Sequence, residues 1–194
     1  MPNWCDTTYK CVGNPKEVRK LYDVIKANDK RTEPRVNNGF GTLWLGCIID
    51  QLGEDWEQFR CRGEITWYEL NDKGNILTIC QNTAWCEQEG FRKCIEKVFP
   101  SIKVFYREEE PGCEVFCTND AKAKFFPDRY LLDCYDNPMY FETLGEAAEY
   151  VMDIVGHQVE ATTKAIDEAL DEYVEEHEDE DVFYSFHEFK IVTD

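Results

Sequence analysis

The stretch from Cys61 to Phe105 constrains the fold most, because strand, turn, strand, helix and strand signals follow one another within it. Residues Gly63–Leu70 are rich in β-branched and aromatic side chains, which is typical of a strand. Asn71–Asn75 has the Asn, Asp and Gly residues of a tight turn, and Ile76–Gln81 is predicted as the returning strand. This pattern predicts a β-hairpin.

A helix and a third strand are expected after the hairpin. Thr83 is a possible N-cap in sequence terms, and Pro100 is expected to end the helix. Apolar residues with helical spacing form one stripe, namely Phe91, Cys94, Ile95 and Val98. Ser101–Tyr106 then alternates as a strand does.

The N-terminal residues supply a matching strand and helix. Trp4–Val12 is predicted as a strand, and Asn14-Pro15 followed by Glu17 is a typical helix start. The helix repeats the same apolar spacing at Val18, Leu21, Tyr22 and Ile25. Together the two parts predict an α+β fold with a ferredoxin-like βαββαβ antiparallel sheet, both helices covering one face.

An insertion separates the first helix from the hairpin, over residues 28–60. Its first half has the Pro, Asn and Gly content of a loop. Its second half predicts a short helix with an apolar stripe, closed by Gly53. We expect three aromatic side chains to attach this insertion to the core, those of Trp44, Trp56 and Phe59.

The remaining chain predicts extra strands and two C-terminal helices. The strands are expected over Cys113–Thr118 and Arg129–Cys134, and the helices over Leu144–Val155 and Thr163–His177, the first with a capping box. The tail Val182–Val192 is dense in aromatic residues and is expected to dock. We therefore predict a ferredoxin-like domain over residues 1–135 and an acidic helical extension with an aromatic tail over 136–194.

The negative charge is concentrated near the C-terminus. The chain has a net charge of −19, and residues 136–181 hold 16 Asp/Glu and one Lys, so this segment alone carries −15. A basic cluster at Lys122, Lys124 and Arg129 is small beside it. Direct binding to nucleic acid is therefore disfavoured, because phosphates repel such a chain.

The cysteines and the first residues favour an intracellular protein. Ten cysteines are present, but no Cys-x-x-Cys pair occurs and several fall on apolar stripes, so we predict ten free thiols. The first residues lack a signal-peptide pattern, and no apolar run is long enough to span a membrane. We expect a cytoplasmic location and no membrane association.

Several short motifs resemble one known family. These are Met1-Pro2-Asn3-Trp4-Cys5, Cys61-Arg62-Gly63, Thr83-Ala84-Trp85, Thr118-Asn119-Asp120 and Phe126-Pro127-Asp128-Arg129-Tyr130. They resemble the uncharacterised YubB-like ferredoxin-like family of bacteria and phages, over about residues 1–135. The resemblance implies the same fold and an origin on a mobile genetic element. It implies no catalytic or binding residue.

No catalytic, cofactor or metal site is predicted. The three histidines, His157, His177 and His187, all lie in the C-terminal third, far in sequence from most cysteines. Residues 175–178 (Glu-Glu-His-Glu) are successive on a helix and so cannot converge on one ion. Residues 39–41 (Gly-Phe-Gly) lack the context of a dinucleotide fingerprint or an RNA-recognition strand, so we interpret them as a hinge.

Two functional hypotheses remain from the sequence. The first is a non-enzymatic protein-interaction module, whose sharper form is an acidic nucleic-acid mimic that binds a basic host or element-encoded partner. Its predicted surface consists of Asp167, Glu168, Asp171, Glu172, Glu175 and Glu176. The alternative is a small cytoplasmic enzyme with a pocket between the insertion and the sheet. Solubility alone is the simplest role for the acidic helices.

Overall fold

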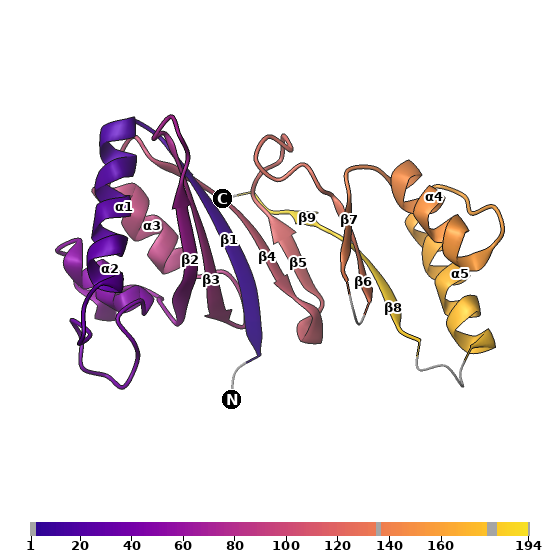
Figure 1. Ribbon diagram of the computed structural model, residues 1–194, viewed down its shortest axis with the longest axis horizontal. Coiled ribbons are helices and arrows are strands. Elements are labelled where there is room, and N and C mark those ends of the chain that lie inside the picture. Colours follow the sequence, from indigo (N-terminus) through magenta and orange to yellow (C-terminus); the bar gives the residue numbers. More distant parts are fainter. Residues whose placement is uncertain (1–2, 135–136, 178–181, 194) are drawn as a thin grey trace. The chain divides into compact units, whose positions relative to one another are not determined.

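The computed structural model describes residues 3–134, 137–177 and 182–193. The chain divides into two compact units, Met1–Asn119 and Asp120–Thr193. Figure 1 shows the helices and strands of each unit. The protein belongs to the α+β class, as the sequence predicts.

An antiparallel sheet forms the centre of the first unit. Its strands follow the spatial order β2-β3-β1-β4-β5, and each neighbouring pair runs antiparallel. Their bounds are β1 (Trp4–Val12), β2 (Gly63–Leu70), β3 (Ile76–Ala84), β4 (Lys103–Glu110) and β5 (Val115–Thr118). The central strand β1 therefore lies between β3 and β4. These two strands correspond to the returning strand of the hairpin and to the strand predicted after the helix.

Helices cover one face of this sheet. The bounds are α1 (Pro15–Asp29), the inserted α2 (Leu45–Gln51) and α3 (Glu89–Val98), with short 3-10 turns η1 (Trp56–Gln58) and η2 (Pro111–Cys113). Asn14 caps α1 by accepting a hydrogen bond from the Lys16 N–H, as its sequence predicts. Figure 1 shows all three α-helices on the same side of β1–β4.

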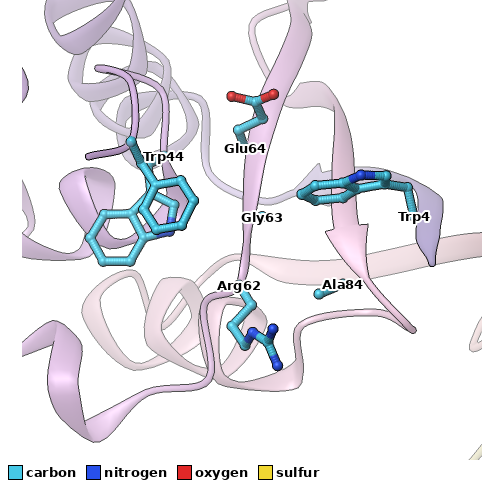
Figure 2. A pocket seen from close by; sticks show the side chains of 7 residues that line it. Trp4, Trp44, Arg62, Gly63, Glu64 and Ala84 are labelled. Carbon is cyan, nitrogen blue, oxygen red and sulfur yellow. The ribbon is translucent and has the colours of Figure 1, made fainter. Parts of the chain in front are cut away.

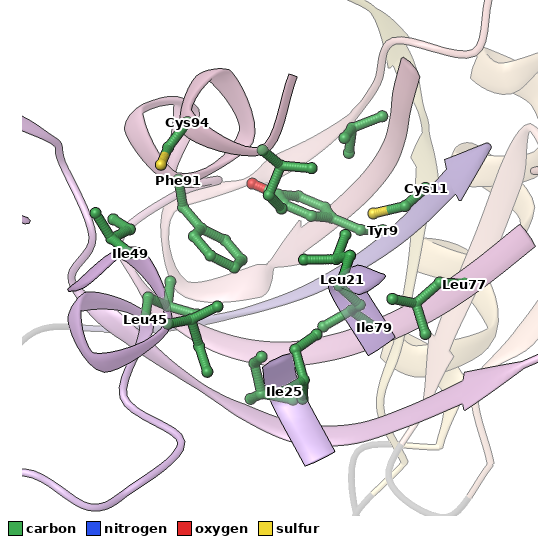
Figure 3. Packing of buried hydrophobic residues seen from close by; sticks show 14 of the residues in the cluster. Tyr9, Cys11, Leu21, Ile25, Leu45, Ile49, Leu77, Ile79, Phe91 and Cys94 are labelled. Atoms are coloured by element: carbon green, nitrogen blue, oxygen red, sulfur yellow. The ribbon is translucent and has the colours of Figure 1, made fainter. Parts of the chain in front are cut away.

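One apolar core joins the three helices to the sheet. Leu21 and Ile25 of α1, Ile49 of α2 and Phe91 of α3 are fully buried together with alternate strand residues. Figure 3 shows these side chains around Tyr9, whose ring stacks on that of Phe91 at a centroid distance of 6.1 Å. The three aromatic residues expected to attach the insertion all pack in or against this core.

The structure corrects the predicted start of α3. Thr83 does not cap the helix; it lies within β3, where its hydroxyl pairs with that of Thr7 at 3.0 Å and donates to the Cys5 carbonyl. The helix begins six residues later at Glu89, after an irregular segment. The hydroxyl gains buried partners from β1 that no local signal indicates.

The second unit has its own sheet and core. Strands β6 (Tyr130–Cys134), β7 (Met139–Phe141) and β8 (Tyr184–Glu188) form an antiparallel sheet in the order β7-β6-β8. Helices α4 (Leu144–Val155) and α5 (Thr163–Glu176) pack with it around a separate apolar cluster, and β9 (Lys190–Ile191) ends the described strands. The capping box of Thr143 and Glu146 is present, as predicted.

The boundary between the two units lies between Asn119 and Asp120, earlier in the sequence than predicted. The predicted boundary, at residues 135 and 136, lies outside the described residues. The predicted boundary, which follows the extent of the family resemblance, places β6 in the first domain. This strand pairs instead with β7 and β8, and Leu132 is buried in the second cluster. Pairing with strands that come later in the chain decides which unit β6 joins.

The cysteines and the helices complete the description of the fold. None of the ten cysteines forms a disulfide bond in the structure, and five of them are buried, namely Cys5, Cys11, Cys47, Cys61 and Cys94. Cys113 lies in η2 rather than on the predicted strand.

Across the described residues, every helix is too short or too polar to cross a lipid bilayer.

Candidate functional site

A pocket of about 360 Å³ opens in the first unit where the insertion meets the sheet. The insertion contributes Phe40 and Trp44. The sheet side contributes Trp4 from β1, Ala84 from β3, Gly63 and Glu64 from β2, and Arg62, which directly precedes β2. In Figure 2 the indoles of Trp44 and Trp4 lie on opposite sides of the segment that carries Gly63.

Trp44 is held in place by close packing on three sides. A Cβ atom on Gly46 would lie 2.1 Å from the indole, so only glycine leaves room for the ring. Trp56 packs against Trp44 edge-on at a centroid distance of 5.1 Å, and Phe40 stacks on it at 5.6 Å. The wall of the pocket on the insertion side is therefore a preformed aromatic stack.

The start of β2 is fixed against the neighbouring segments. The Arg62 N–H donates to Gln88 Oε1 at 2.8 Å, and the Ile65 N–H donates to the Leu43 carbonyl at 3.0 Å. A Cβ on Gly63 would lie 2.6 Å from the Asn82 carbonyl oxygen, so glycine permits the close approach of β2 to β3. These contacts set the backbone from which the two charged residues project.

Arg62 and Glu64 give the pocket one positive and one negative group. Arg62 lies in a tight turn just before β2, in which the Gly63 N–H donates to the Cys61 carbonyl at 3.1 Å, and Glu64 lies on β2 itself. Both residues are exposed, and within the described part of the chain neither side chain has a hydrogen bond or ion pair. The lining residues include no cysteine, histidine or serine, so the pocket has the features of a binding site rather than of a nucleophilic one.

A buried polar cluster lies on the helix side of the same sheet. The Tyr9 hydroxyl donates to Glu87 Oε1, and Arg92 Nε donates to the same oxygen at 3.0 Å. The guanidinium of Arg92 also lies 5.2 Å from the ring centroid of Tyr106. The ion pair is almost fully buried, with side-chain exposures of 3% for Arg92 and 6% for Glu87.

A second carboxyl group extends the cluster. Glu108 Oε2 accepts the Glu87 N–H at 2.5 Å and the Cys5 thiol at 3.8 Å. Burial raises the pKa of both Glu87 and Glu108, and Arg92 opposes the rise at each; the Glu108 carboxylate adds to the rise at Glu87. Burial also raises the pKa of the Cys5 thiol to about 12, which makes it a poor nucleophile at neutral pH.

The buried cluster holds the irregular segment between β3 and α3. Gln88 Nε2 donates to the carbonyls of Ala84 at 3.3 Å and Cys86 at 2.8 Å. Trp85 between them has a left-handed φ of 74° while its side chain stays 42% exposed. Perturbed carboxyl groups occur often at catalytic sites. None of these carboxyl groups lines the pocket, so we interpret the cluster as support for its rim.

The predicted acidic surface lies entirely on α5. All six of its carboxylates are exposed, and they occupy adjacent turns opposite the buried Ile166, Ala169 and Leu170. Lys164 pairs with Glu168 at 3.1 Å, but both side chains are largely in solvent, so the pair stabilises little. Partial burial raises the pKa of Asp167, and the carboxylate of Asp171 adds to that rise.

Other residues singled out from the sequence have local roles. Arg129 Nη2 donates to the Asp120 carbonyl at 2.6 Å, and Lys124 lies over the ring of Phe125, so these cations have contacts within the second unit. Glu146 accepts N–H groups at the start of α4 as part of the capping box. Within the described residues no three His, Cys, Asp or Glu side chains gather as a metal site would require; Glu178 lies outside them.

Sequence reasoning assigned Phe40 to a hinge and gave no role to Trp4, Arg62 or Glu64. Phe40 is 57% exposed and lines the pocket, a role that the hinge interpretation did not include. The aromatic residues Trp4 and Phe40 are visible in the sequence, but only the fold shows that they line the same pocket. No protein-family model matches the chain, and no curated protein matches it either.

Proposed function

We propose that the chain is a non-enzymatic interaction module that binds a basic protein partner through the exposed face of α5. The observation that carries this proposal is the set of six exposed carboxylates on consecutive turns of one helix. The set is Asp167, Glu168, Asp171, Glu172, Glu175 and Glu176. A basic surface placed against this helix would meet negative charge from Asp167 to its end at Glu176.

The arrangement is unfavourable for the free protein. Residues four apart on a helix are neighbours about 6 Å apart along the axis, and like charges at that spacing repel each other. Asp167, Asp171 and Glu175 form one such row, and the pKa of Asp167 is raised by partial burial and, in addition, by the neighbouring carboxylate of Asp171. A partner with Lys and Arg residues would relieve this repulsion. Solubility alone would be served equally well by charges dispersed over the unit.

A nucleic-acid mimic is the sharper form of the same proposal. Regular rows of carboxylates present negative charge to a protein much as phosphates do, so a DNA-binding groove is a suitable partner surface. The second unit concentrates this charge, with 21 Asp/Glu and five Lys/Arg over residues 120–194. We also infer that the first unit is a ferredoxin-like domain of the YubB-like type; its strand order β2-β3-β1-β4 and its helices on one face support this.

An enzyme remains the alternative, and the pocket of the first unit is the feature that favours it. Glu64 is the one carboxylate among the residues that line this pocket, and no second acid, base or nucleophile accompanies it there. General acid–base catalysis usually needs a partner group of matched pKa. The pocket therefore supports ligand binding better than catalysis.

Charge reversal on α5 tests the interaction proposal. The variant carries Lys at positions Asp167, Glu168, Asp171 and Glu172, and the immobilised full-length chain is used to capture proteins from a bacterial lysate. We expect the wild-type chain to retain basic, nucleic-acid-binding proteins that an excess of duplex DNA releases, and the variant to lose them.

A matched control reverses four exposed acids of the first unit, Asp23, Glu33, Glu69 and Asp72, which changes the net charge equally. The control should capture the same proteins as the wild type. Equal loss in both variants would show that net charge alone matters, and unchanged capture by the α5 variant would leave solubility as the role of this surface. Circular dichroism of each variant establishes that its helices are intact.

A further inference from the structure

The pocket of the first unit combines two features that a ligand could use: exposed aromatic surface and a pair of oppositely charged side chains. It lies wholly among residues of the first unit, whereas the proposed docking face is on α5 of the second. An inference about the pocket is therefore independent of the interaction proposal, and either can fail without the other.

The aromatic surface favours a flat ligand. Trp4 and Phe40 are 49% and 57% exposed, and both line an apolar pocket, so a ligand in the pocket would meet their exposed rings. Trp44 behind Phe40 is only 6% exposed and is fixed over Gly46, so the aromatic wall does not need to form on binding. A preformed stack of this kind binds planar rings well, because stacking covers apolar surface at little loss of conformational entropy.

The charges define the two ends of such a ligand. Arg62 precedes β2 and Glu64 lies on it, and Figure 2 shows their side chains toward opposite ends of the pocket. A carboxylate accepts hydrogen bonds only, whereas a guanidinium donates in a fork that matches phosphate or carboxylate. The ligand should therefore have hydrogen-bond donors at one end and an anionic group at the other.

We propose that this pocket binds a guanine mononucleotide. The base stacks on the exposed rings of Trp4 and Phe40, its N1–H and N2 amino group donate to the carboxylate of Glu64, and its phosphate accepts from Arg62. Guanine has two adjacent donors on that edge, which a carboxylate can accept together. Adenine has one amino group beside a ring nitrogen that only accepts, so the same carboxylate disfavours adenine.

Two other ligand classes fit the charges less well. An organic cation would suit an aromatic cage with an acid, but Arg62 would repel it. A long nucleic-acid strand would meet a unit with 16 Lys/Arg and 19 Asp/Glu, which gives no net attraction for a polyanion. A mononucleotide places one phosphate near one arginine and requires no extended basic surface.

Isothermal titration calorimetry with the full-length chain tests the ligand class. The ligands are guanosine monophosphate, adenosine monophosphate, guanosine, a five-nucleotide single strand with one guanine, and a trimethyl-lysine peptide. We expect guanosine monophosphate to bind more tightly than adenosine monophosphate by roughly 5- to 150-fold, the range that good bidentate base contacts provide. It should also exceed guanosine by roughly 10- to 100-fold because of the charge-assisted phosphate contact.

Variants assign each contact to a residue. Glu64→Gln should abolish the preference for guanine over adenine, and Arg62→Ala should abolish the preference for the nucleotide over the nucleoside. Trp4→Ala should weaken binding by roughly 5- to 150-fold through lost stacking. Trp67→Ala is the matched control, because Trp67 is also 49% exposed on β2 but does not line the pocket.

Four results would each overturn the proposal. They are the absence of measurable binding of guanosine monophosphate to the folded wild-type chain, equal affinity for the adenine nucleotide, equal losses in the Trp4 and Trp67 variants, and tighter binding of the trimethyl-lysine peptide. Tighter binding of the single strand than of the mononucleotide would also refute the mononucleotide assignment and identify strand recognition instead.

Discussion

The buried ion pair between Arg92 and Glu87 offers the sharpest test of how the first unit is stabilised. Replacing Arg92 by Met keeps an apolar chain of similar length but leaves Glu87 without its cation in a nearly water-free site. Breaking one partner of a buried pair costs about 3–5 kcal/mol, because the remaining charge is uncompensated. We expect the variant to lose stability in this range at pH 7.

Tryptophan fluorescence during urea unfolding is a suitable measurement. All five tryptophans lie between residues 4 and 85, within the first unit, so the signal reports that unit alone. With a denaturant slope of about 2 kcal/mol per M, a loss of 4 kcal/mol would lower the midpoint by roughly 2 M. The slope itself should stay unchanged if only stability is altered.

The pH dependence provides a second, independent readout. Burial raises the pKa of Glu87, and Arg92 opposes that rise. A carboxyl group whose folded pKa is raised binds more protons folded than unfolded, so its contribution to stability falls as pH rises from the unfolded value through the folded one. Removing Arg92 raises the folded pKa further, so the variant should recover more stability than the wild type when the pH is lowered from 7 toward 5.

A double variant decides whether this reasoning is correct. Glu87→Gln in the Arg92→Met background removes the unpaired charge and should restore part of the lost stability. A double variant no more stable than Arg92→Met alone would refute the argument, since the loss would then come from packing, including the contact of Arg92 with Tyr106. Glu87→Gln should also flatten the additional pH dependence.

Three further predictions concern other parts of the chain. Gly46→Ala should destabilise the first unit by about 1–3 kcal/mol and shift tryptophan emission, because the new methyl group would displace the ring of Trp44; unchanged emission would contradict the packing described. Thr143→Ala should remove the capping box with Glu146 and destabilise the second unit by about 1 kcal/mol, measured as faster amide hydrogen exchange in α4. Alkylation without reductant should modify all ten cysteines after denaturation but leave the five buried ones protected in the native protein, where exposed Cys113 reacts first; protected pairs after denaturation would reveal disulfides.

Local sequence signals determined many elements of this protein. Asn14 and Pro15 start α1 where the sequence places its beginning, and Thr143 with Glu146 starts α4 in the same way. Strand β1 also has the predicted bounds. Each of these signals depends on groups within about four residues of one another, such as a side-chain oxygen and a free N–H of the first helical turn.

The tertiary structure decided what depends on distant partners. Thr83 has the chemistry of an N-cap, but hydroxyl and carbonyl groups of β1 hold it in a strand. Strand β6 joins the second unit because its hydrogen-bonding partners come from β7 and β8. A strand's backbone groups are satisfied only by another segment, so its own sequence does not specify which segment that is.

The pocket is the clearest case of this difference. Trp4, Phe40 and Glu64 are far apart in the chain and carry no shared local pattern, yet β1, the insertion and β2 bring them to one cavity. Glu87 and Arg92 likewise look like ordinary surface charges of a helix start until the sheet buries them. Sequence patterning determined which faces are apolar, and the packing of those faces against each other determined which polar and aromatic side chains meet.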